Sequence, residues 1–222
     1  MTTFVQPPAY PLRLRGVLDE RQARWSWLYK WFLAIPHLIV LGLLWIAVVV
    51  AWMIAGLSVL FTTRYPRPLF DFVVGVLRWS WRVSFYAFAP IGTDIYPPFS
   101  LERDDSYPAD LDVDYPPTLS RGLVLVKWWL LIIPQAIVVA LLSGGWGPAH
   151  FSLISVLALA GVITRLINGR YPGDLFRLTV GLQRWCYRVM AYGLLLTDVY
   201  PPFRLDQGEW DPTPASYAVP VP

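Results

Sequence analysis

Long apolar stretches alternate along the chain with shorter segments that carry its charges. Residues 31–63 contain no charged side chain, and neither do residues 128–164. About 20 consecutive apolar residues are enough to cross the hydrocarbon core of a bilayer. Each apolar run therefore predicts membrane-spanning helix, and the pattern indicates an integral membrane protein built from two similar halves.

The second apolar run is interrupted by a turn signal. The sequence S-G-G-W-G-P at 143–148 predicts a break between two helices, at about 122–142 and 149–168, which would form a transmembrane hairpin. The first run, read as one helix, would be about 50 Å long. By analogy with the second run we predict a hairpin that turns near Gly42, and the alternative is one long tilted helix.

An amphipathic helix is predicted after each apolar run, at roughly 68–89 and 173–195. Its polar residues recur every three or four positions, which places them on one helical face. A helix of this kind is typical of the membrane interface, because arginine at the bilayer centre costs at least about 2.5–3.5 kcal/mol. We favour four spans and two interfacial helices, and the alternative is a third span per repeat, six in all. The stripes are Asp71, Gly75, Arg78, Arg82 and Tyr86, and then Asp174, Arg177, Gly181, Arg184, Arg188 and Tyr192.

These elements occur twice because the chain is internally duplicated. Residues 64–99 and 170–203 share R-Y-P, L-F, V-G, R-W, R-V, Tyr and finally T-D-[IV]-Y-P-P-F. A repeat of this length predicts two similar units that pack against each other. We assign structural roles to the R-Y-P turns and to the Asp and Tyr of the last motif. These residues are Arg64, Tyr65, Pro66, Asp94 and Tyr96, with Arg170, Tyr171, Pro172, Asp198 and Tyr200 in the second copy.

The predicted fold class is all-α integral membrane, with two tandem repeats that each contain a hairpin and an Arg/Trp-bearing helix. The first and last segments are rich in proline, and the connection between the repeats is acidic. We expect the connection to be solvated and extended, and the tail to be disordered. The predicted organisation is a cytoplasmic arm at 1–23, repeats at 24–101 and 122–205, an acidic linker at 102–121 and a tail at 206–222.

Composition supports the membrane assignment. Hydrophobic residues make up 56% of the chain and charged residues 15%, whereas soluble domains carry about 25% charged residues. The 12 Trp and 12 Tyr suit membrane interfaces, and the net charge of +3 does not suggest nucleic acid. The predicted hairpin tips carry no charge, while the arginines lie on the other side. The positive-inside rule then predicts a multi-pass protein of the plasma or inner membrane with cytoplasmic N- and C-termini.

Sequence motifs of catalysis are missing from the chain. It has no phosphate-binding glycine loop, no zinc-protease motif and no nucleophile elbow. The single cysteine, Cys186, occupies the position of Ser80 in the first copy, so the repeat does not require a thiol there. His37 and Gln135 are also equivalent, which favours a hydrogen-bonding role in packing. We therefore predict a protein that is not an enzyme and holds no metal or cofactor.

The paired arginines of the amphipathic helices lie next to tryptophans. A guanidinium group can donate two parallel hydrogen bonds to a phosphate, and an indole ring suits the headgroup layer. The alternative is pairing within the protein, to Asp71, Asp94, Asp174 and Asp198. The candidate lipid- or partner-binding residues are Arg78, Trp79, Arg82, Arg184, Trp185 and Arg188.

The paired pattern [K]-W-x-L-x-I-P-[HQ], R-Y-P-x-x-L-F, V-G-x-x-R-W-x-x-R-V and T-D-x-Y-P-P-F resembles a bacterial, largely actinobacterial, integral membrane family of unknown function. The resemblance covers about residues 28–101 and 126–205. It implies a membrane location and no particular activity or substrate. We predict an accessory or scaffold subunit, or a lipid-interacting protein, of the cell envelope. Its partners would be membrane lipids, including anionic ones, and a larger membrane complex. A small transporter or channel built from pseudo-symmetric repeats is the alternative.

Overall fold

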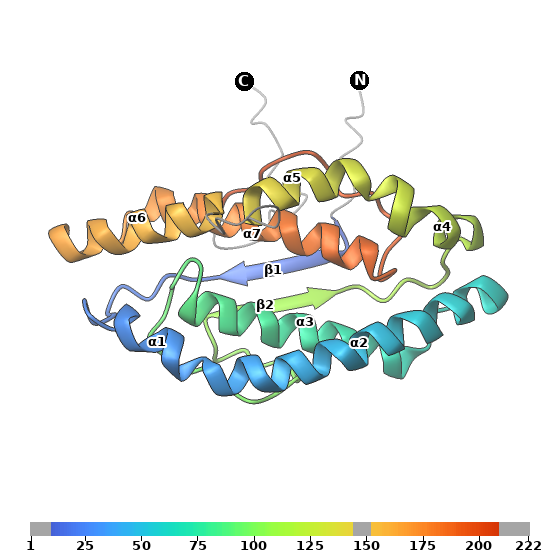
Figure 1. The fold of residues 1–222 in the computed structure, drawn as a ribbon, viewed down its shortest axis with the longest axis horizontal. Helices are drawn as coiled ribbons and strands as arrows, with labels where there is room; N and C mark the ends of the chain where they lie inside the picture. The colour runs from blue at the N-terminus through green and yellow to red at the C-terminus, as the bar shows by residue number, and fades with distance from the viewer. Residues whose placement is uncertain (1–9, 144–151, 209–222) are drawn as a thin grey trace, which may run out of the picture.

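The computed structural model describes residues 10–143 and 152–208, and most of them are helical (Figure 1). Helices α1 and α2 lie along one long edge of the molecule, and α4, α5 and α6 lie along the opposite edge (Figure 1). Between them are α3, α7 and a ribbon of two strands. The prediction of a helical, duplicated protein is confirmed, but the all-α class is wrong because of this ribbon.

The ribbon pairs β1 (Leu12–Gly16) with β2 (Ala109–Val113) in antiparallel orientation. Leucine and arginine alternate in β1, and the leucines are buried while Arg13 is exposed. Alternation of apolar and charged residues is the signature of a strand with one buried face. The two strands lie in the segments that we expected to be an arm and a solvated linker.

An approximate two-fold axis passes through the centre of the ribbon. The offset of 97 residues that separates Lys30 from Lys127 also separates Leu14 from Leu111, and these two leucines are direct partners in the ribbon. The two strands are therefore equivalent parts of the duplicated unit. Each repeat begins well upstream of the motif that reveals it in the sequence.

Repeat one contains α1 (Trp27–Leu33), α2 (Ile35–Thr62) and α3 (Arg67–Ala87). Helix α2 is continuous through 28 residues, so the predicted turn near Gly42 is wrong and the alternative of one long helix is correct. A single glycine costs a helix about 1 kcal/mol relative to alanine, which is too little to break a run of good helix formers. The helix ends at Thr63, whose φ of 61° is left-handed.

Repeat two contains α4 (Arg121–Val126), the π turn η1 (Lys127–Leu131) and α5 (Ile133–Ser143). They are followed by α6 (Leu153–Asn168) and α7 (Gly173–Gly193). Helices α5 and α6 flank the predicted turn on the expected sides. Residues 144–151 of the turn itself lie outside the described part of the chain.

The π turn has a simple origin. Lys127 and Pro134 are one residue further apart than Lys30 and Pro36. A π turn holds one more residue than an α-helical turn, and here the Ile132 amide donates to the Lys127 carbonyl at 3.1 Å. The extra residue is absorbed locally, so both lysines and both prolines keep equivalent places.

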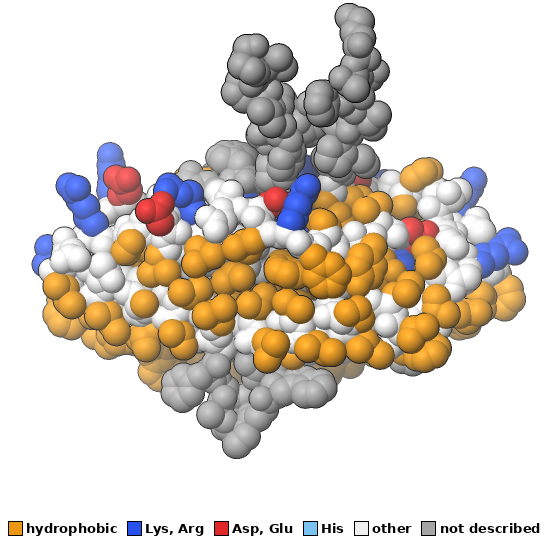
Figure 2. All heavy atoms as spheres, turned by 90° about the horizontal axis from the view of Figure 1, so that it is seen from above, with side chains coloured by type: hydrophobic (Ala, Val, Ile, Leu, Met, Phe, Trp, Pro, Cys, Tyr) orange, Lys and Arg blue, Asp and Glu red, His pale blue; other side chains and the backbone are white. Residues whose placement is uncertain are grey.

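A large part of the surface is apolar. Helix α2 buries one stripe of side chains, and on its other sides Ile39, Leu43 and Ile46 are 63%, 65% and 65% exposed. Figure 2 shows hydrophobic side chains across the viewed face, with most charges at its ends and along one margin. Within the described residues, α2 is long and apolar enough to cross a membrane, and α5 and α6 are shorter apolar helices.

Helices α3 and α7 form the centre of the molecule. Most of their side chains are buried, including all four arginines of the R-W-x-x-R motif. We predicted that these helices lie in the membrane interface with their polar stripe toward the headgroups. The structure instead turns the arginines toward the ribbon and the segments beside it, because those parts of the protein supply carbonyl and carboxylate oxygens.

Candidate functional site

The arginine pair of repeat one is held by β2. The Nε of Arg78 donates to the Leu111 carbonyl at 2.8 Å and lies 3.2 Å from an Asp110 oxygen. The same carboxylate lies 3.2 Å from a terminal nitrogen of Arg82. Arg78, Arg82 and Asp110 are 8%, 0% and 6% exposed. One buried carboxylate thus serves two buried guanidinium groups, and Asp112 adds a longer contact to Arg78 of 3.4 Å.

The arginine pair of repeat two follows the same plan with a different carboxylate. Arg184 donates to the Leu14 carbonyl at 2.9 Å, as Arg78 does to the equivalent Leu111. Arg188 pairs with Asp206 at 2.6 Å, and Arg184 donates to the backbone carbonyl of Asp206. Asp206 is 8% exposed. The start of the predicted tail is therefore part of the core.

The carboxylates that we expected to pair with these arginines lie elsewhere. Asp71 and Asp174 form exposed pairs on their own helices, with Arg67 and Arg177. Asp94 and Asp198 pair with lysines. The predicted principle of intramolecular pairing is confirmed, but the predicted partners are wrong, since the ribbon and the segment after the second Y-P-P-F motif supply the counter-charges.

The candidate lipid-binding residues are enclosed by protein. Each repeat brings its two arginines and one tryptophan together, and most of these side chains are fully buried; Trp185 is half-buried. A guanidinium group that contacts a lipid phosphate must reach the surface, which these four do not. The residues concerned are Arg78, Trp79, Arg82, Arg184, Trp185 and Arg188.

The two tryptophans donate to the equivalent residues His37 and Gln135. The indole of Trp79 donates to His37 Nδ1 at 3.0 Å, and Trp185 donates to the Gln135 side-chain oxygen at 2.8 Å. Gln135 also donates to the Pro201 carbonyl at 2.8 Å. In His37, by contrast, Nε2 is buried without a partner among the described residues. The predicted hydrogen-bonding role in packing is therefore present in both copies. In repeat two both the oxygen and the nitrogen of the Gln135 side chain are hydrogen-bonded, whereas in repeat one only Nδ1 of His37 has a partner among the described residues.

A buried lysine precedes each long apolar helix. Lys30 and Lys127 are both 0% exposed. Lys30 lies 2.6 Å from Asp94, and Lys127 lies 2.6 Å from Asp198. Sequence reasoning missed these lysines as functional candidates, although a lysine just before tryptophan in both copies was a usable signal.

Each of these aspartates also accepts a hydrogen bond from a backbone amide at the start of its repeat. The Ala23 amide donates to Asp94 at 2.6 Å, and the Ser120 amide donates to Asp198 at 2.7 Å. Burial raises the pKa of the Asp94 carboxyl, but hydrogen bonds from Lys30, Ser26 and the Ala23 amide outweigh it and hold that pKa below its ordinary value. The aspartate of the motif therefore anchors three segments at one point.

The R-Y-P turns have structural positions, as expected. Tyr65 is 1% exposed, and its carbonyl accepts a hydrogen bond from the Tyr115 hydroxyl. The second turn has a half-buried tyrosine, and both turns have an exposed arginine. In the last motif the Tyr96 hydroxyl donates to the Leu33 carbonyl at 3.2 Å, while Tyr200 contacts Tyr192 edge to face. The residues of the turns are Arg64, Tyr65 and Pro66, with Arg170, Tyr171 and Pro172 as their copies.

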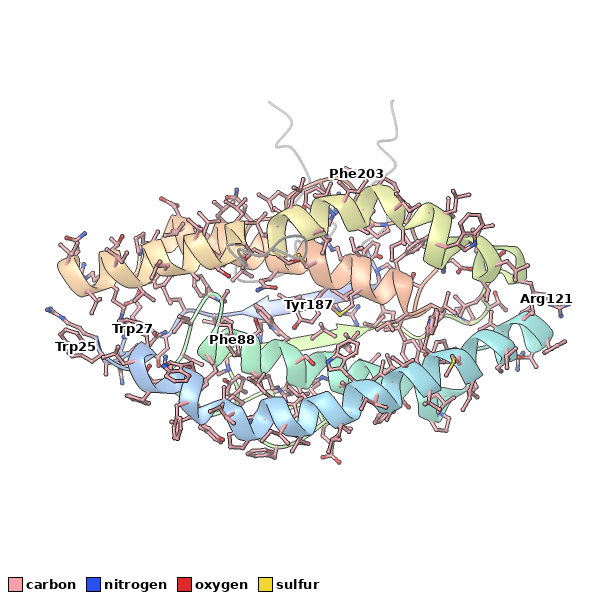
Figure 3. The ribbon with its side chains drawn as sticks, in the orientation of Figure 1. Trp25, Trp27, Phe88, Arg121, Tyr187 and Phe203 are labelled. Atoms are coloured by element: carbon pink, nitrogen blue, oxygen red, sulfur yellow. The ribbon has the colours of Figure 1, made fainter. Side chains whose placement is uncertain are left out.

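The arrangement holds segments together more than it presents reactive groups. Figure 3 shows the side chains crowded between the two helical edges, with Tyr187 in the central layer. Cys186 is a buried free thiol. In the described ranges there is no cluster of three or more His, Cys, Asp or Glu side chains that could hold a metal ion.

Comparison with known proteins adds a family. The model of a domain of unknown function, DUF4389, matches the chain twice, at residues 24–100 and 124–204. Neither the curated proteins nor the solved structures yield a match. The two matched segments coincide with the helical parts of the two repeats and cover most of the chain. The chain therefore belongs to the DUF4389 family and carries two tandem copies of its domain.

Proposed function

We propose that this protein is a non-enzymatic integral membrane module, an accessory or scaffold subunit of the cell envelope that contacts lipid along its long apolar helices. The observation that carries the proposal is the exposed apolar side of α2. Leu43, Ile46 and Leu57 are 65%, 65% and 60% exposed, and the helix contains no charged residue. Water contact with so much apolar surface is unfavourable by about 25 cal/mol per Å², whereas lipid contact removes this penalty.

Helices α5 and α6 supply the matching surface in repeat two. Leu141 and Ile167 are both well exposed, at 73% and 75%. At a rise of about 1.5 Å per residue, neither helix alone reaches the roughly 30 Å of a bilayer core. We therefore propose that α2 is embedded in the membrane and that α5 and α6 together form the second embedded segment.

Charge distribution supports the sidedness of the proposal. Arg13, Asp112 and Asp114 form an exposed ion-pair group on the ribbon, with Arg13 2.6 Å from Asp114. Exposed charges must remain in water, and we propose that this face of the ribbon and both termini are cytoplasmic.

A scaffold role fits the way the charges are used. The buried arginines and lysines are engaged with protein oxygens and stabilise one arrangement of the segments. A rigid, lipid-embedded body of this kind suits a subunit that docks a larger membrane complex. Purification in mild detergent followed by mass spectrometry should then find a protein partner in stoichiometric amount.

The membrane proposal is tested by cysteine labelling in the Cys186→Ala background. Ile46→Cys introduces a thiol on the exposed face of α2, and Asp114→Cys introduces one beside the ribbon. A membrane-impermeant maleimide should label the Asp114→Cys variant after the cells are permeabilised, and should leave Ile46→Cys unlabelled until detergent is added. Equal labelling of both variants in intact membranes would contradict the proposal.

The alternative of a small transporter draws on the pseudo-two-fold symmetry. However, the axis passes through Leu14 and Leu111, which are 1% and 0% exposed. A substrate path along the axis would have to displace this pair. We therefore prefer the scaffold, and solute flux into proteoliposomes of the purified protein is the result that would reverse this preference.

A further inference from the structure

A polar hollow lies at the corner where the N-terminal segment crosses the turn between α6 and α7. Its volume is about 520 Å³. The walls come from the segment that follows β1, from the end of α6 and from the start of α7. Its charged and polar side chains are Asp19, Glu20, Arg21, Gln22, Arg165 and Arg170.

The equivalent corner of repeat one is filled. There the Arg67 guanidinium lies 4.7 Å from the centre of the Tyr115 ring, and the Tyr115 hydroxyl donates to the Tyr65 carbonyl. Leu119 closes the corner, with its amide donating to the Thr63 carbonyl at 2.8 Å. The buried Leu119 and the Tyr115 ring, with Arg67 stacked on its outer side, thus stand where repeat two has its hollow.

Three substitutions between the copies account for the hollow. By the offsets that align the repeats, Leu18 stands for Tyr115, Gln22 for Leu119 and Gly173 for Arg67. A fourth change replaces the buried Val59 with Arg165, which is 6% exposed. Repeat two has therefore lost the side chains that fill this corner and has gained polar groups in their place.

Several of these groups are donors that suit a phosphate. Gln22 is 9% exposed, and its side-chain oxygen accepts from Arg165, so its amide nitrogen faces away from Arg165. That nitrogen has no partner among the described residues. Arg170 and Arg21 are exposed at the rim. Helix α7, 21 residues long, begins at Gly173 on the wall, and the free amides of a first helical turn attract anions.

The hollow also contains two carboxylates, Asp19 and Glu20. A simple anion would lie close to them and would be repelled. A group that carries a phosphate and an ammonium side by side satisfies both kinds of wall, because ammonium pairs with carboxylate and phosphate pairs with guanidinium. The mixed lining therefore favours a zwitterionic ligand over a purely anionic one.

We propose that this corner binds a phosphate ester that carries a primary ammonium, that is, a phosphoethanolamine group. A membrane lipid is the source that the surroundings favour, and to that extent the site rests on the proposed membrane function. Arg24 lies against Gly169 on the wall of the hollow, and the neighbouring Trp25 is 66% exposed. Figure 3 shows Trp25 at the end of the molecule where α6 ends. An exposed tryptophan near a polar hollow suits the headgroup layer of a membrane, where a lipid presents its phosphate and ammonium groups.

The experiment uses the full chain in nanodiscs that contain equal amounts of phosphatidylethanolamine, phosphatidylglycerol and phosphatidylcholine. Native mass spectrometry after release into mild detergent identifies the retained lipid. We expect one phosphatidylethanolamine per chain, retained about tenfold over either other lipid, since roughly 1.4 kcal/mol of selective contact gives this factor. Soluble glycerophosphoethanolamine is the competitor that would reveal a soluble source, by displacing the lipid at millimolar concentration.

Two variants and one control make the test specific. Arg170→Ala removes an exposed guanidinium at the rim, and the double variant Leu18→Tyr with Gly173→Arg fills the hollow as repeat one does. A Cβ at Gly173 meets only the Arg177 side chain, at 3.6 Å, so the backbone leaves room for a side chain to start there. Both should lose the preference for phosphatidylethanolamine, whereas Arg64→Ala in the filled corner should retain it.

Equal retention of the three lipids by the wild-type chain, or retention by the filled variant, would overturn the site. A melting curve of each variant establishes that it is folded, and Arg170→Ala alone decides the matter if the double variant is not. Failure of the site is distinct from failure of the membrane proposal. In the first case Ile46→Cys remains protected in the bilayer without any lipid preference, and in the second it is labelled.

Discussion

The two repeats place the same arginine pair on the same helix but neutralise it in different ways. In repeat one the carboxylate is Asp110, on the strand that crosses the helix. In repeat two the strand position equivalent to Asp110 is Arg13, and the carboxylate comes from Asp206. The duplicated scaffold thus preserves the balance of charge at each site and not the identity of the residue that provides it.

The ribbon shows where the two copies diverge in charge. Arg13 lies opposite Asp112, and Arg15 lies opposite Asp110. Cross-strand pairs of opposite charge favour the ribbon, and like charges would oppose it. Here the complementarity comes from a basic β1 and an acidic β2, so equivalent positions of the two repeats carry opposite charges. Once β1 is basic, repeat two needs a carboxylate from elsewhere, and the segment that follows its Y-P-P-F motif provides it.

The largest expected effect comes from removing the shared carboxylate of repeat one. Asp110→Ala should lower the free energy of unfolding by about 3–5 kcal/mol, because it leaves buried guanidinium charge without its main counter-ion. Asp206→Ala should cost less, since this carboxylate pairs with the buried Arg188 and the partly exposed Arg204, whereas Asp110 lies between two buried arginines. Denaturant unfolding in detergent, followed by tryptophan fluorescence, measures both. Equal costs would indicate that the two counter-ions are equivalent despite their different origins.

The next effect concerns the lysine–aspartate pair. Asp94→Asn should lower the free energy of unfolding by about 2–3 kcal/mol at neutral pH. This loss is small for a broken ion pair because the Asp94 carboxylate is partly exposed. The folded-state pKa of Asp94 lies below the ordinary value of 3.8. Its contribution is therefore complete above that pH and is lost as the pH falls through the folded-state pKa.

Melting temperatures between neutral and acid pH check this prediction. The wild-type protein should lose stability below about pH 4 by this linkage, and Asp94→Asn should flatten that part of the curve. An unchanged acid limb in the variant would assign the loss to other carboxylates.

A smaller effect separates the two tryptophan partners. Gln135→His should cost about 1–3 kcal/mol, because the Pro201 carbonyl then loses its donor in a buried place. His37→Gln should be neutral or stabilising by about 1 kcal/mol, since the amide can donate to the carbonyl of Pro97 as Gln135 does in the other copy. Thermal unfolding of the two exchanges gives the sign, and a loss in both would show that the two pockets differ in shape.

The smallest effect is expected at the exposed pairs. Asp71→Ala and Asp174→Ala should each change the free energy of unfolding by less than about 0.5 kcal/mol. Their side chains are 56% and 95% exposed, so water already solvates both charges. These variants are the controls for Asp110→Ala, because the sequence alone made them equally good partners for the arginines. A cost comparable to that of Asp110→Ala would mean that these exposed carboxylates also neutralise the buried arginines.

The sequence by itself determined the duplication, the helices and the apolar surface. The repeated R-Y-P and Y-P-P-F motifs fixed the limits of α3 and α7 to within a few residues, because hydrophobic periodicity and proline act locally along the chain. The uncharged run before them predicted the exposed apolar helix α2. Its single long form was an alternative that local signals could not select, since a lone Gly42 is compatible with a turn or a helix.

Tertiary structure alone decided what the charges do. Arg78 meets Asp110 and Arg184 meets Leu14 across many residues of chain, and no local pattern records such partners. The short strand around Leu14 was read as a charged arm, because a strand gains its hydrogen bonds from a partner far along the chain. The hollow near Gln22 likewise depends on which segment crosses which corner, and that crossing exists only once the two copies have packed around their common axis.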